Sequence, residues 1–194
     1  MWQNRVSLLR VYAINSSVNE TIHLTMDYYF KEINSPVGNI KLVASDTGLA
    51  AVLWEHDNPN RINIRHYTKN NQHPVLLETE RQLQEYFCGK RKSFQLPLEF
   101  IGTDFQKKVW EALLTIPFGE TRTYKQIAEQ IDNPQSQQAV GNANNKNPIA
   151  IIAPCHRVIG ASGKLVGFAG GLKNKDILLK IEGYKKEQIS IWND

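Results

Sequence analysis

Cysteine is scarce in this sequence, whose 194 residues contain only Cys88 and Cys155. Two thiols cannot build a disulfide framework, and they cannot supply three or four thiolate ligands to a zinc ion. The five histidines show no metal-ligand spacing with each other or with the cysteines. We therefore expect a fold that needs no disulfide bonds and that binds no structural metal.

Long hydrophobic runs are also absent. No stretch approaches the ~20 consecutive apolar residues that a membrane-spanning helix needs. The one candidate for a targeting signal, the apolar stretch over 6–14, is interrupted by Arg10 and lacks a small-residue cleavage site. We therefore expect a cytoplasmic protein with no membrane partner, and we treat residues 1–26 as a leader of unclear role.

A strong excess of either charge is missing too. The 23 basic and 19 acidic residues leave a net charge of +4. Three of these four charges fall in residues 101–194, which hold 12 basic and 9 acidic groups. Such a balance permits binding to nucleic acid without requiring it. With 41% hydrophobic residues, the chain has the composition of an ordinary globular protein.

The first half of the chain has the pattern of a small sheet followed by a helix. Two runs with the pattern of strands, over 40–44 and 49–54, lie on either side of an Asp-Thr-Gly turn, which predicts a β-hairpin. A polar, loop-like stretch over 56–73 follows. Pro74 then opens a predicted helix that ends at Gly89, before a linker that reaches the second half.

The second half has the pattern of short helices. Two capping boxes of the form Thr-x-x-Gln, at 103–106 and 123–126, predict the starts of two helices. A turn at 132–134 and a further helical pattern over 136–143 complete a helix-turn-helix. Helix pairs that pack for stability are commoner than pairs that read DNA, so this pattern alone leaves both interpretations open. The apolar run over 149–153 predicts a buried strand.

Cys155 is the most informative single residue. It directly follows the predicted buried strand and precedes a glycine-rich stretch, a position from which a side chain can project from a rigid edge. A free thiol has a pKa of about 8.5, and cationic neighbours of the types found at His156 and Arg157 raise its thiolate fraction. We therefore interpret Cys155 as reactive and Cys88, which follows an apolar helix face, as an inert packing residue.

Four other residues each have more than one role open to them. His156 acts on Cys155 directly, acts through a water, or is structural. Glu182, at the end of a last helix predicted over 172–182, either orients His156 or lies on the surface. Tyr124 is a core residue or a donor into a cleft, and Asn147 either sits in an ordinary turn or ties that turn with its side chain. Spacing alone does not decide between these roles.

Several segments of the chain together form a wider signature. They are Ser35-Pro36-Val37-Gly38, Asp46-Thr47-Gly48-Leu49, Phe118-Gly119-Glu120, Thr123-Tyr124, Ile127-Ala128, Ala139-Val140-Gly141, Asn147-Pro148, Pro154-Cys155-His156-Arg157-Val158-Ile159-Gly160, Gly163 and Gly170-Gly171-Leu172. In order and spacing this set resembles the O6-alkylguanine-DNA alkyltransferase family. The resemblance implies an α+β fold, with a small N-terminal α/β domain of the ribonuclease H-like kind and a C-terminal, winged-helix-like domain that contains the helix-turn-helix.

These patterns divide the chain into four parts. They are a leader over 1–26, an N-terminal α/β domain over 27–98, a C-terminal DNA-binding and catalytic domain over 99–184, and a tail over 185–194.

The resemblance also implies a chemistry. Cys155 takes the alkyl group from O6-methylguanine, and also from O4-methylthymine, in one irreversible displacement that needs no cofactor. His156, a water and Glu182 activate the thiol. Asn147 holds the turn that supports it, and Tyr124 hydrogen-bonds the departing base. The implied enzyme is a methylated-DNA–protein-cysteine methyltransferase that inactivates itself after one turnover.

For DNA binding, the resemblance implies a monomer that places the second helix of the helix-turn-helix in the minor groove of duplex DNA. The damaged nucleotide is flipped into a pocket, and in a bacterium the protein would be associated with the nucleoid. The residues expected to contact DNA are Gln137, Gln138, Ala139, Gly141 and Arg157. The residues expected to line the base pocket are Tyr124, Val158, Phe168 and Ala169.

Two residues depart from the family pattern. Gln138 stands where an arginine usually fills the space left by the flipped base, and Phe168 stands where tyrosine is common. Glutamine lacks the charge and the planar stacking surface of arginine, so we expect weaker DNA binding or slower flipping. The alternative function is a non-catalytic alkyltransferase-like DNA-damage binder, but such proteins replace the nucleophile, and Cys155 is present.

Overall fold

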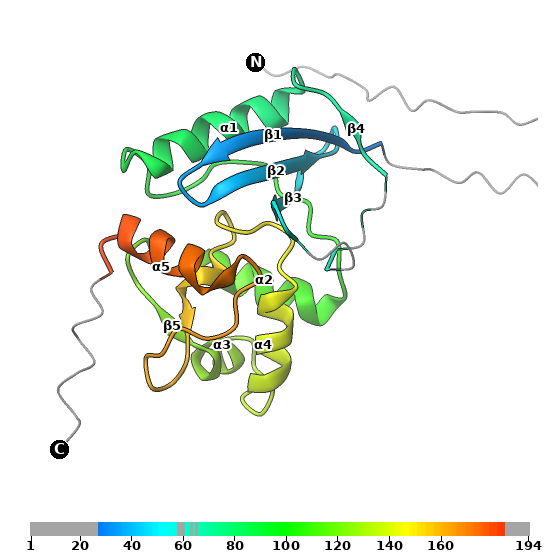
Figure 1. The fold of residues 1–194 in the computed structure, drawn as a ribbon. Coiled ribbons are helices and arrows are strands. Elements are labelled where there is room, and N and C mark those ends of the chain that lie inside the picture. Colours follow the sequence, from blue (N-terminus) through cyan, green and yellow to red (C-terminus); the bar gives the residue numbers. More distant parts are fainter. Residues whose placement is uncertain (1–26, 58–60, 63, 65, 185–194) are drawn as a thin grey trace, which may run out of the picture.

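The computed structural model describes residues 27–57, 61–62, 64 and 66–184 (Figure 1). The predicted leader over 1–26 and the predicted tail over 185–194 lie outside these residues. Within the described part, no helix is both long and apolar enough to cross a lipid bilayer.

A four-stranded sheet with the order β3-β2-β1-β4 forms the first half of the molecule. Its strands are β1 (Tyr29–Ser35), β2 (Gly38–Ala44), β3 (Leu49–Trp54) and β4 (Thr68–Lys69). The predicted hairpin is confirmed, because β2 and β3 pair antiparallel with Leu42 opposite Val52. The prediction that residues 56–73 form only a loop is wrong in one respect, because β4 lies within this stretch and pairs parallel with β1.

The two faces of this sheet are covered differently. Helix α1 (Pro74–Phe87) begins at the predicted proline and lies along one face, where its Leu76 and Leu83 join the main core (Figure 1). On the other face Val43 and Leu53 form a smaller, separate cluster with residues of the loop before β4. Both faces of the sheet are therefore buried, as in an α/β domain.

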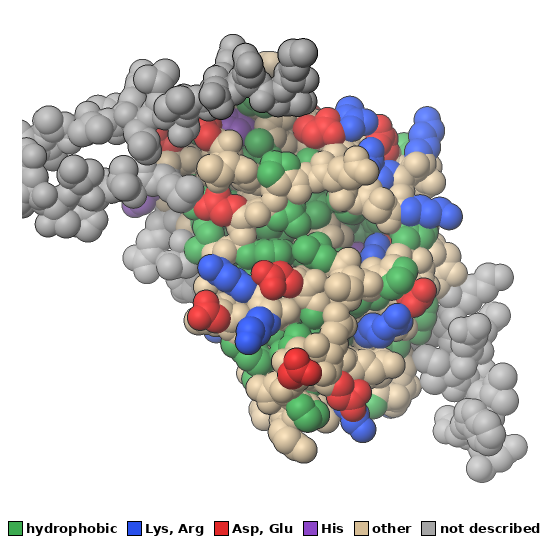
Figure 2. All heavy atoms as spheres, turned by 180° about the vertical axis from the view of Figure 1, so that it is seen from behind, with side chains coloured by type: hydrophobic (Ala, Val, Ile, Leu, Met, Phe, Trp, Pro, Cys, Tyr) green, Lys and Arg blue, Asp and Glu red, His purple; other side chains and the backbone are tan. Residues whose placement is uncertain are grey.

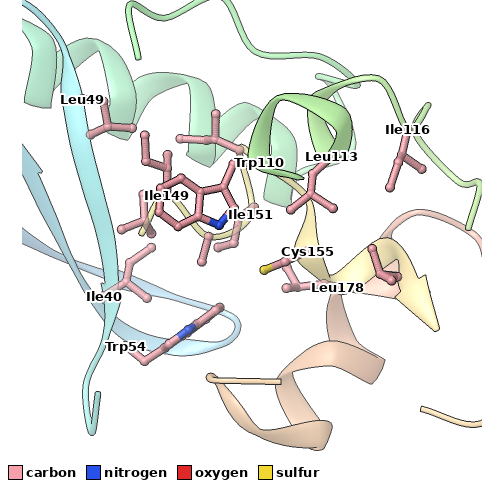
Figure 3. Close-up of a cluster of buried hydrophobic side chains, with 14 of the residues drawn as sticks. Ile40, Leu49, Trp54, Trp110, Leu113, Ile116, Ile149, Ile151, Cys155 and Leu178 are labelled. Atoms are coloured by element: carbon pink, nitrogen blue, oxygen red, sulfur yellow. The ribbon is translucent and has the colours of Figure 1, made fainter. Parts of the chain in front are cut away.

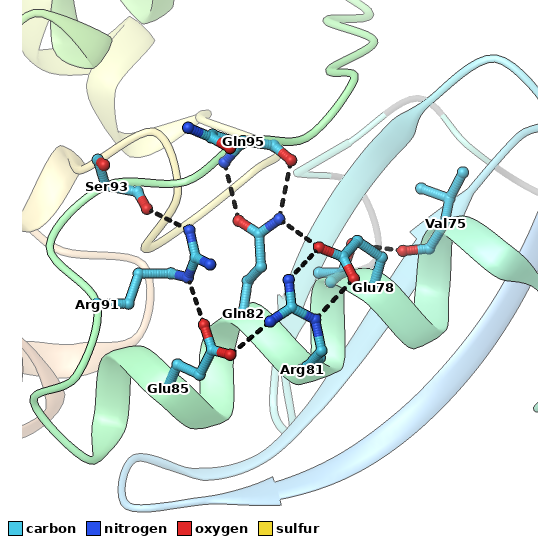
Figure 4. A network of polar contacts seen from close by, with 9 residues as sticks. Val75, Glu78, Arg81, Gln82, Glu85, Arg91, Ser93 and Gln95 are labelled. Carbon is cyan, nitrogen blue, oxygen red and sulfur yellow. Dashed lines mark hydrogen bonds and ion pairs between the residues drawn. The ribbon is translucent and has the colours of Figure 1, made fainter. Parts of the chain in front are cut away.

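The linker after α1 is held against that helix by a polar network (Figure 4). The side-chain amide of Gln82 donates to the main-chain oxygen of Gln95 at 2.8 Å and accepts from its N–H at 2.8 Å. Arg81 pairs with Glu85, which also accepts from Arg91 at 2.8 Å. The linker thus follows a fixed path to the second half of the chain.

Helices dominate the second half. They are α2 (Asp104–Leu114), α3 (Tyr124–Gln130), α4 (Gln137–Asn145) and α5 (Gly171–Ile181), with a one-turn helix η1 (Cys155–Arg157) and a two-stranded sheet of β5 (Arg122–Thr123) and β6 (Val158–Ile159). Both predicted capping boxes are confirmed at the starts of α2 and α3. The predicted helix-turn-helix corresponds to α3 and α4, which pack against each other and against α2.

One hydrophobic core joins the two halves. Figure 3 shows Ile40 and Trp54 of the sheet facing Trp110 and Leu113 of α2 within a single cluster. The edge of β3 also bonds to the second half, because the Val52 N–H donates to the main-chain oxygen of Pro148 at 2.9 Å. The sheet therefore supports the chain segment that leads to Cys155.

Two sequence predictions need correction. The run over 149–153 is buried, but it is not a strand, because only Ile149 forms an isolated bridge to β3 and turns follow. Ile151 has φ of 72°, a left-handed conformation that is costly for a β-branched residue and persists only where the surroundings impose it. Cys88 is exposed rather than packed, because it lies just beyond the last residue of α1.

Candidate active site

Cys155 opens the one-turn helix η1 and has only 4% of its surface exposed. The turn before it is closed by the Asn147 side chain, which donates to the Ala153 oxygen at 2.7 Å and accepts from the Ile149 N–H at 3.1 Å. The N–H of Cys155 itself donates to the Ala153 oxygen at 2.8 Å. The thiol therefore sits at the end of a turn whose main chain is held on both sides.

Burial is the dominant influence on the Cys155 thiol and raises its pKa. A hydrogen bond from the Asn147 side chain opposes this rise, as do the positive charges of Arg61 and Lys175. From the sequence, His156 and Arg157 were the cations expected to act on this thiol. The structure brings other cations to the thiol, from a loop of the first half and from α5.

His156 is completely buried and pairs with Glu182, with 2.8 Å between Nε2 and Oε1. Its Nδ1 has no hydrogen-bond partner among the described residues. Burial lowers the pKa of His156, although the Glu182 carboxylate acts in the opposite direction. A neutral imidazole that donates from Nε2 keeps a free lone pair on Nδ1, which can accept a proton.

Glu182 lies at the C-terminal end of α5 and is the centre of a buried polar network. Besides His156, it accepts from Arg157 Nε at 2.8 Å, from Tyr86 Oη at 2.7 Å and from the Gly119 N–H at 3.1 Å. Burial alone would raise its pKa, but the hydrogen bonds and charges of His156 and Arg157 outweigh burial and lower the pKa to about 2. The carboxylate is therefore ionised at neutral pH.

Arg157 occupies a different place from the one predicted. It is only 6% exposed, and its guanidinium pairs with Glu182 and donates to the Ile116 oxygen at 2.5 Å. In this conformation it presents no charge to a DNA backbone.

Tyr124 is the first residue of α3 and is half-buried. Burial raises its pKa, a nearby Cys155 charge raises it further, and a hydrogen bond with Asn144 acts against the rise. Gly141 of α4 lies against the ring, since a Cβ there would be 3.7 Å from it. The phenol is thus protonated at neutral pH and lies near the thiol.

Lys175 is a residue of this site that was not predicted from the sequence. It is fully buried, and its Nζ donates to the main-chain oxygens of Val158 at 2.6 Å and Val166 at 3.0 Å. Burial lowers its pKa to about 8, although the Cys155 charge acts in the opposite direction. The available signal was a lysine on the same helical face as Leu178, three residues later, where an apolar residue is expected.

Two of the residues expected to form a base pocket, Val158 and Phe168, lie near Lys175. Its Nζ lies 6.0 Å from the ring centre of Phe168, which is half-buried, while the neighbouring Ala169 is exposed. Trp54 of β3 supports this loop, because its ring lies edge-on to Phe168 at 5.4 Å. A Cβ on Gly170 would come within 2.5 Å of the same indole ring, so only glycine fits there.

The first turn of α4 carries the other residues expected to contact DNA. Gln137, Gln138 and Ala139 are exposed and Gly141 is half-buried, whereas Val140 is buried in the core. On the face of the molecule seen in Figure 2, basic and acidic side chains are interspersed, in keeping with the modest net charge. Among the described residues, no three His, Cys, Asp or Glu side chains gather as they would around a metal ion.

Comparison with known proteins identifies relatives along most of the chain. Residues 28–100 match the ribonuclease-like domain, and residues 104–184 the DNA binding domain, of 6-O-methylguanine DNA methyltransferase. The methylated-DNA–protein-cysteine methyltransferase of Methanosarcina acetivorans is 50% identical over 155 residues, which cover 80% of this chain and 98% of that protein. The protein of the same name from Mycobacterium leprae is 56% identical over 111 residues, 57% of this chain and 67% of that protein.

A solved structure gives the same relationship. The crystal structure of Mycobacterium tuberculosis OGT in complex with DNA superposes with a TM-score of 0.74 at 44% sequence identity. The match covers 80% of this chain and 93% of that one. Sequence and fold thus point to the same group of proteins.

Proposed function

This chain belongs to the 6-O-methylguanine DNA methyltransferase family, and on that premise we propose that it repairs DNA by transferring the methyl group of O6-methylguanine to Cys155. The observation that carries the proposal is the buried Cys155 thiol, which is held by the Asn147 turn and is followed in the chain by His156, itself paired with Glu182. Transfer to a thiol forms a stable thioether. Each molecule therefore acts once and needs no cofactor.

The transfer is a displacement at the methyl carbon. The Cys155 sulfur forms a bond to that carbon while the bond from the carbon to guanine O6 breaks, and the electron pair of the broken bond stays on the base. Because burial raises the pKa of the thiol, its proton must be removed for this step. The free Nδ1 of His156 can receive that proton through a water, and the Glu182 carboxylate then stabilises the imidazolium.

Tyr124 is placed to assist the departing base. Its protonated phenol can donate a hydrogen bond to the guanine as negative charge develops on it. Replacing Tyr124 with Phe is expected to slow single-turnover methyl transfer by roughly 10²-fold, the lower end of general acid catalysis. Rapid-quench measurements on a duplex with O6-methylguanine give this rate, while the affinity for the same duplex stays unchanged. A wild-type rate in Y124F would contradict the role.

DNA binding is assigned to the exposed first turn of α4. We propose that Gln137, Gln138 and Ala139 enter the minor groove, with Gly141 allowing close approach. Flipping the damaged nucleotide costs a few kcal/mol, which contacts to this helix and the pocket offset. With a net charge of only +4, binding should be moderate in strength and should weaken as salt concentration rises.

Gln138 provides a direct test of this surface. Replacing it with Arg is expected to strengthen duplex binding or accelerate flipping by about fivefold, equivalent to roughly 1 kcal/mol, because arginine adds charge and a planar stacking surface. Fluorescence anisotropy and 2-aminopurine stopped-flow measurements give the two quantities. Gln84→Arg on the exposed face of α1 is the matched control for added charge. Equal affinity and rate in Q138R and wild type would reject the assignment.

We further propose that the protein acts as a cytoplasmic monomer on duplex DNA with O6-alkylguanine, and also on O4-methylthymine. We assign the base pocket to half-buried Phe168, buried Val158 and exposed Ala169. The alternative of a non-catalytic damage binder is not favoured, because Cys155 is present and relatives that are 45–56% identical are named as methyltransferases.

The decisive experiment is a titration of the protein with excess duplex that contains O6-methylguanine. Digestion of the DNA and chromatography of its nucleosides count the methyl groups removed. We expect one methyl group lost per protein molecule, after which the reaction stops. Continued turnover would reject the stoichiometric mechanism, and binding without loss of methyl groups would favour the non-catalytic alternative.

A further inference from the structure

Arg61 reaches the active-site turn from the loop between β3 and β4. Its side chain is only 6% exposed and is held by Asp57, with Nε donating to Oδ1 at 2.5 Å and Nη2 donating to Oδ2. Asp57 in turn accepts from the Trp54 N–H at 3.2 Å, at the end of β3. The remaining nitrogen, Nη1, donates to the main-chain oxygen of Asn147.

Through the Asn147 oxygen, Arg61 holds the main chain of a residue that also shapes the turn before Cys155. The side chain of the same residue closes the turn before Cys155, through its bonds to Ala153 and Ile149. The next residue, Pro148, accepts from the N–H of Val52 in β3. Arg61 and β3, both in the N-terminal domain, thus hold the main chain of Asn147 and Pro148. The Asn147 side chain in turn shapes the turn before Cys155.

A buried arginine is costly unless it is paired, and Asp57 supplies that pairing. Two cations act on the Cys155 thiol, Arg61 and Lys175. The pKa of Lys175 is lowered to about 8, so its charge is lost as the pH rises through that value. Arginine remains charged throughout this range. Tyr124, which also interacts with the Cys155 charge, is neutral near pH 7 because burial raises its pKa. The next residue in the chain after the thiol, His156, is neutral because burial lowers its pKa.

We propose that Arg61 is a positioning residue for methyl transfer, which holds the Cys155 turn through the Asn147 oxygen and places a permanent positive charge toward the thiol. The inference rests on the proposed function, because it concerns the same nucleophile. It gives the N-terminal domain a direct part in the reactivity of a residue in the C-terminal domain.

The test compares Arg61→Met, Asp57→Asn and wild type, all in a Cys88→Ala background so that only one thiol remains. Arg81→Met is the matched control, because Arg81 lies on the exposed face of α1 and pairs there with Glu78 and Glu85. Three quantities are measured for each protein. They are the single-turnover transfer rate, the affinity for duplex DNA, and the pH midpoint of Cys155 alkylation by iodoacetamide.

Removing the charge and the contact together should slow transfer by about 10- to 100-fold in R61M, the range expected for a misplaced nucleophile. The alkylation midpoint should move to higher pH, and DNA affinity should not change. D57N keeps the charge but loses the partner that orients it, so transfer should slow while the midpoint rises no higher than in wild type. If thermal melting shows that R61M does not fold, D57N provides the test by itself.

A wild-type rate and midpoint in R61M, or a wild-type rate in D57N, would overturn the proposal. A loss of transfer explained fully by weaker DNA binding would also overturn it. If the wild-type protein itself transferred no methyl group, the proposed function would fail, but the iodoacetamide midpoints would still test the action of Arg61 on the thiol.

Discussion

Replacing Cys155 with Ala is expected to reduce methyl transfer to the uncatalysed background while leaving binding to duplex DNA unchanged. The sulfur is the atom that accepts the methyl group, and the other cysteine among the described residues, Cys88, is exposed. The exposed first turn of α4, which we assign to DNA, does not contain the residue. Chromatography of the digested duplex measures the methyl groups that remain.

The matched control for this variant is Cys88→Ala. Cys88 is exposed beyond the end of α1, so its removal should leave both the rate and the stoichiometry of transfer at wild-type values. Removing the buried Cys155 sulfur should destabilise the fold by only about 1 kcal/mol, within the usual range for a small core change. Measurable transfer in a folded C155A protein would refute the assignment of the nucleophile.

Glu182→Gln is expected to be the most destabilising conservative change in the site. It leaves the buried Arg157 guanidinium without its carboxylate, a type of change that costs about 3–5 kcal/mol. Urea denaturation at neutral pH measures this loss. Tyr86→Phe is the comparison, because it removes only one of the hydrogen bonds to the same carboxylate and should cost about 1 kcal/mol.

The pH dependence of stability distinguishes a lost charge from a lost hydrogen bond. The pKa of Glu182 is about 2 in the folded protein against an ordinary value of 4.5, so its stabilisation is complete above pH 4.5. That stabilisation is lost as the pH falls from 4.5 toward 2, because the unfolded chain binds the proton first. The stability of E182Q should not show this loss between pH 4.5 and 2. The same loss of stability in E182Q as in the wild-type protein would contradict the role of the buried carboxylate.

The parts of the fold that could be predicted from sequence are those with local causes. The capping boxes at Thr103 and Thr123 are local hydrogen-bond patterns, and the β2–β3 hairpin follows from two strand-like runs joined by a short turn. The run over 149–153 was predicted wrongly, because a short apolar run indicates burial but not conformation. Its turns, including Ile151 at positive φ, depend on contacts with β3 and on the Asn147 side chain.

The site divides in the same way. Cys155, His156 and Glu182 were named from a sequence signature, and the structure buries all three and pairs His156 with Glu182. Arg61 and Lys175 were not named, because Arg61 lies in an irregular polar loop and Lys175 in the last helix, and only the fold brings their charges to the thiol. Arg157 was interpreted as a DNA contact because the sequence does not reveal its pairing with Glu182, which lies 25 residues away in the chain.

Peptide mapping after reaction tests the central claim most directly. The wild-type protein is incubated with a duplex containing O6-methylguanine, digested with protease, and both cysteine-containing peptides are analysed by tandem mass spectrometry. The account predicts one methyl group on buried Cys155 in every reacted molecule and none on exposed Cys88, although exposure alone would favour Cys88. A methyl group on Cys88, or no methyl group on either thiol after the DNA has been demethylated, would contradict it.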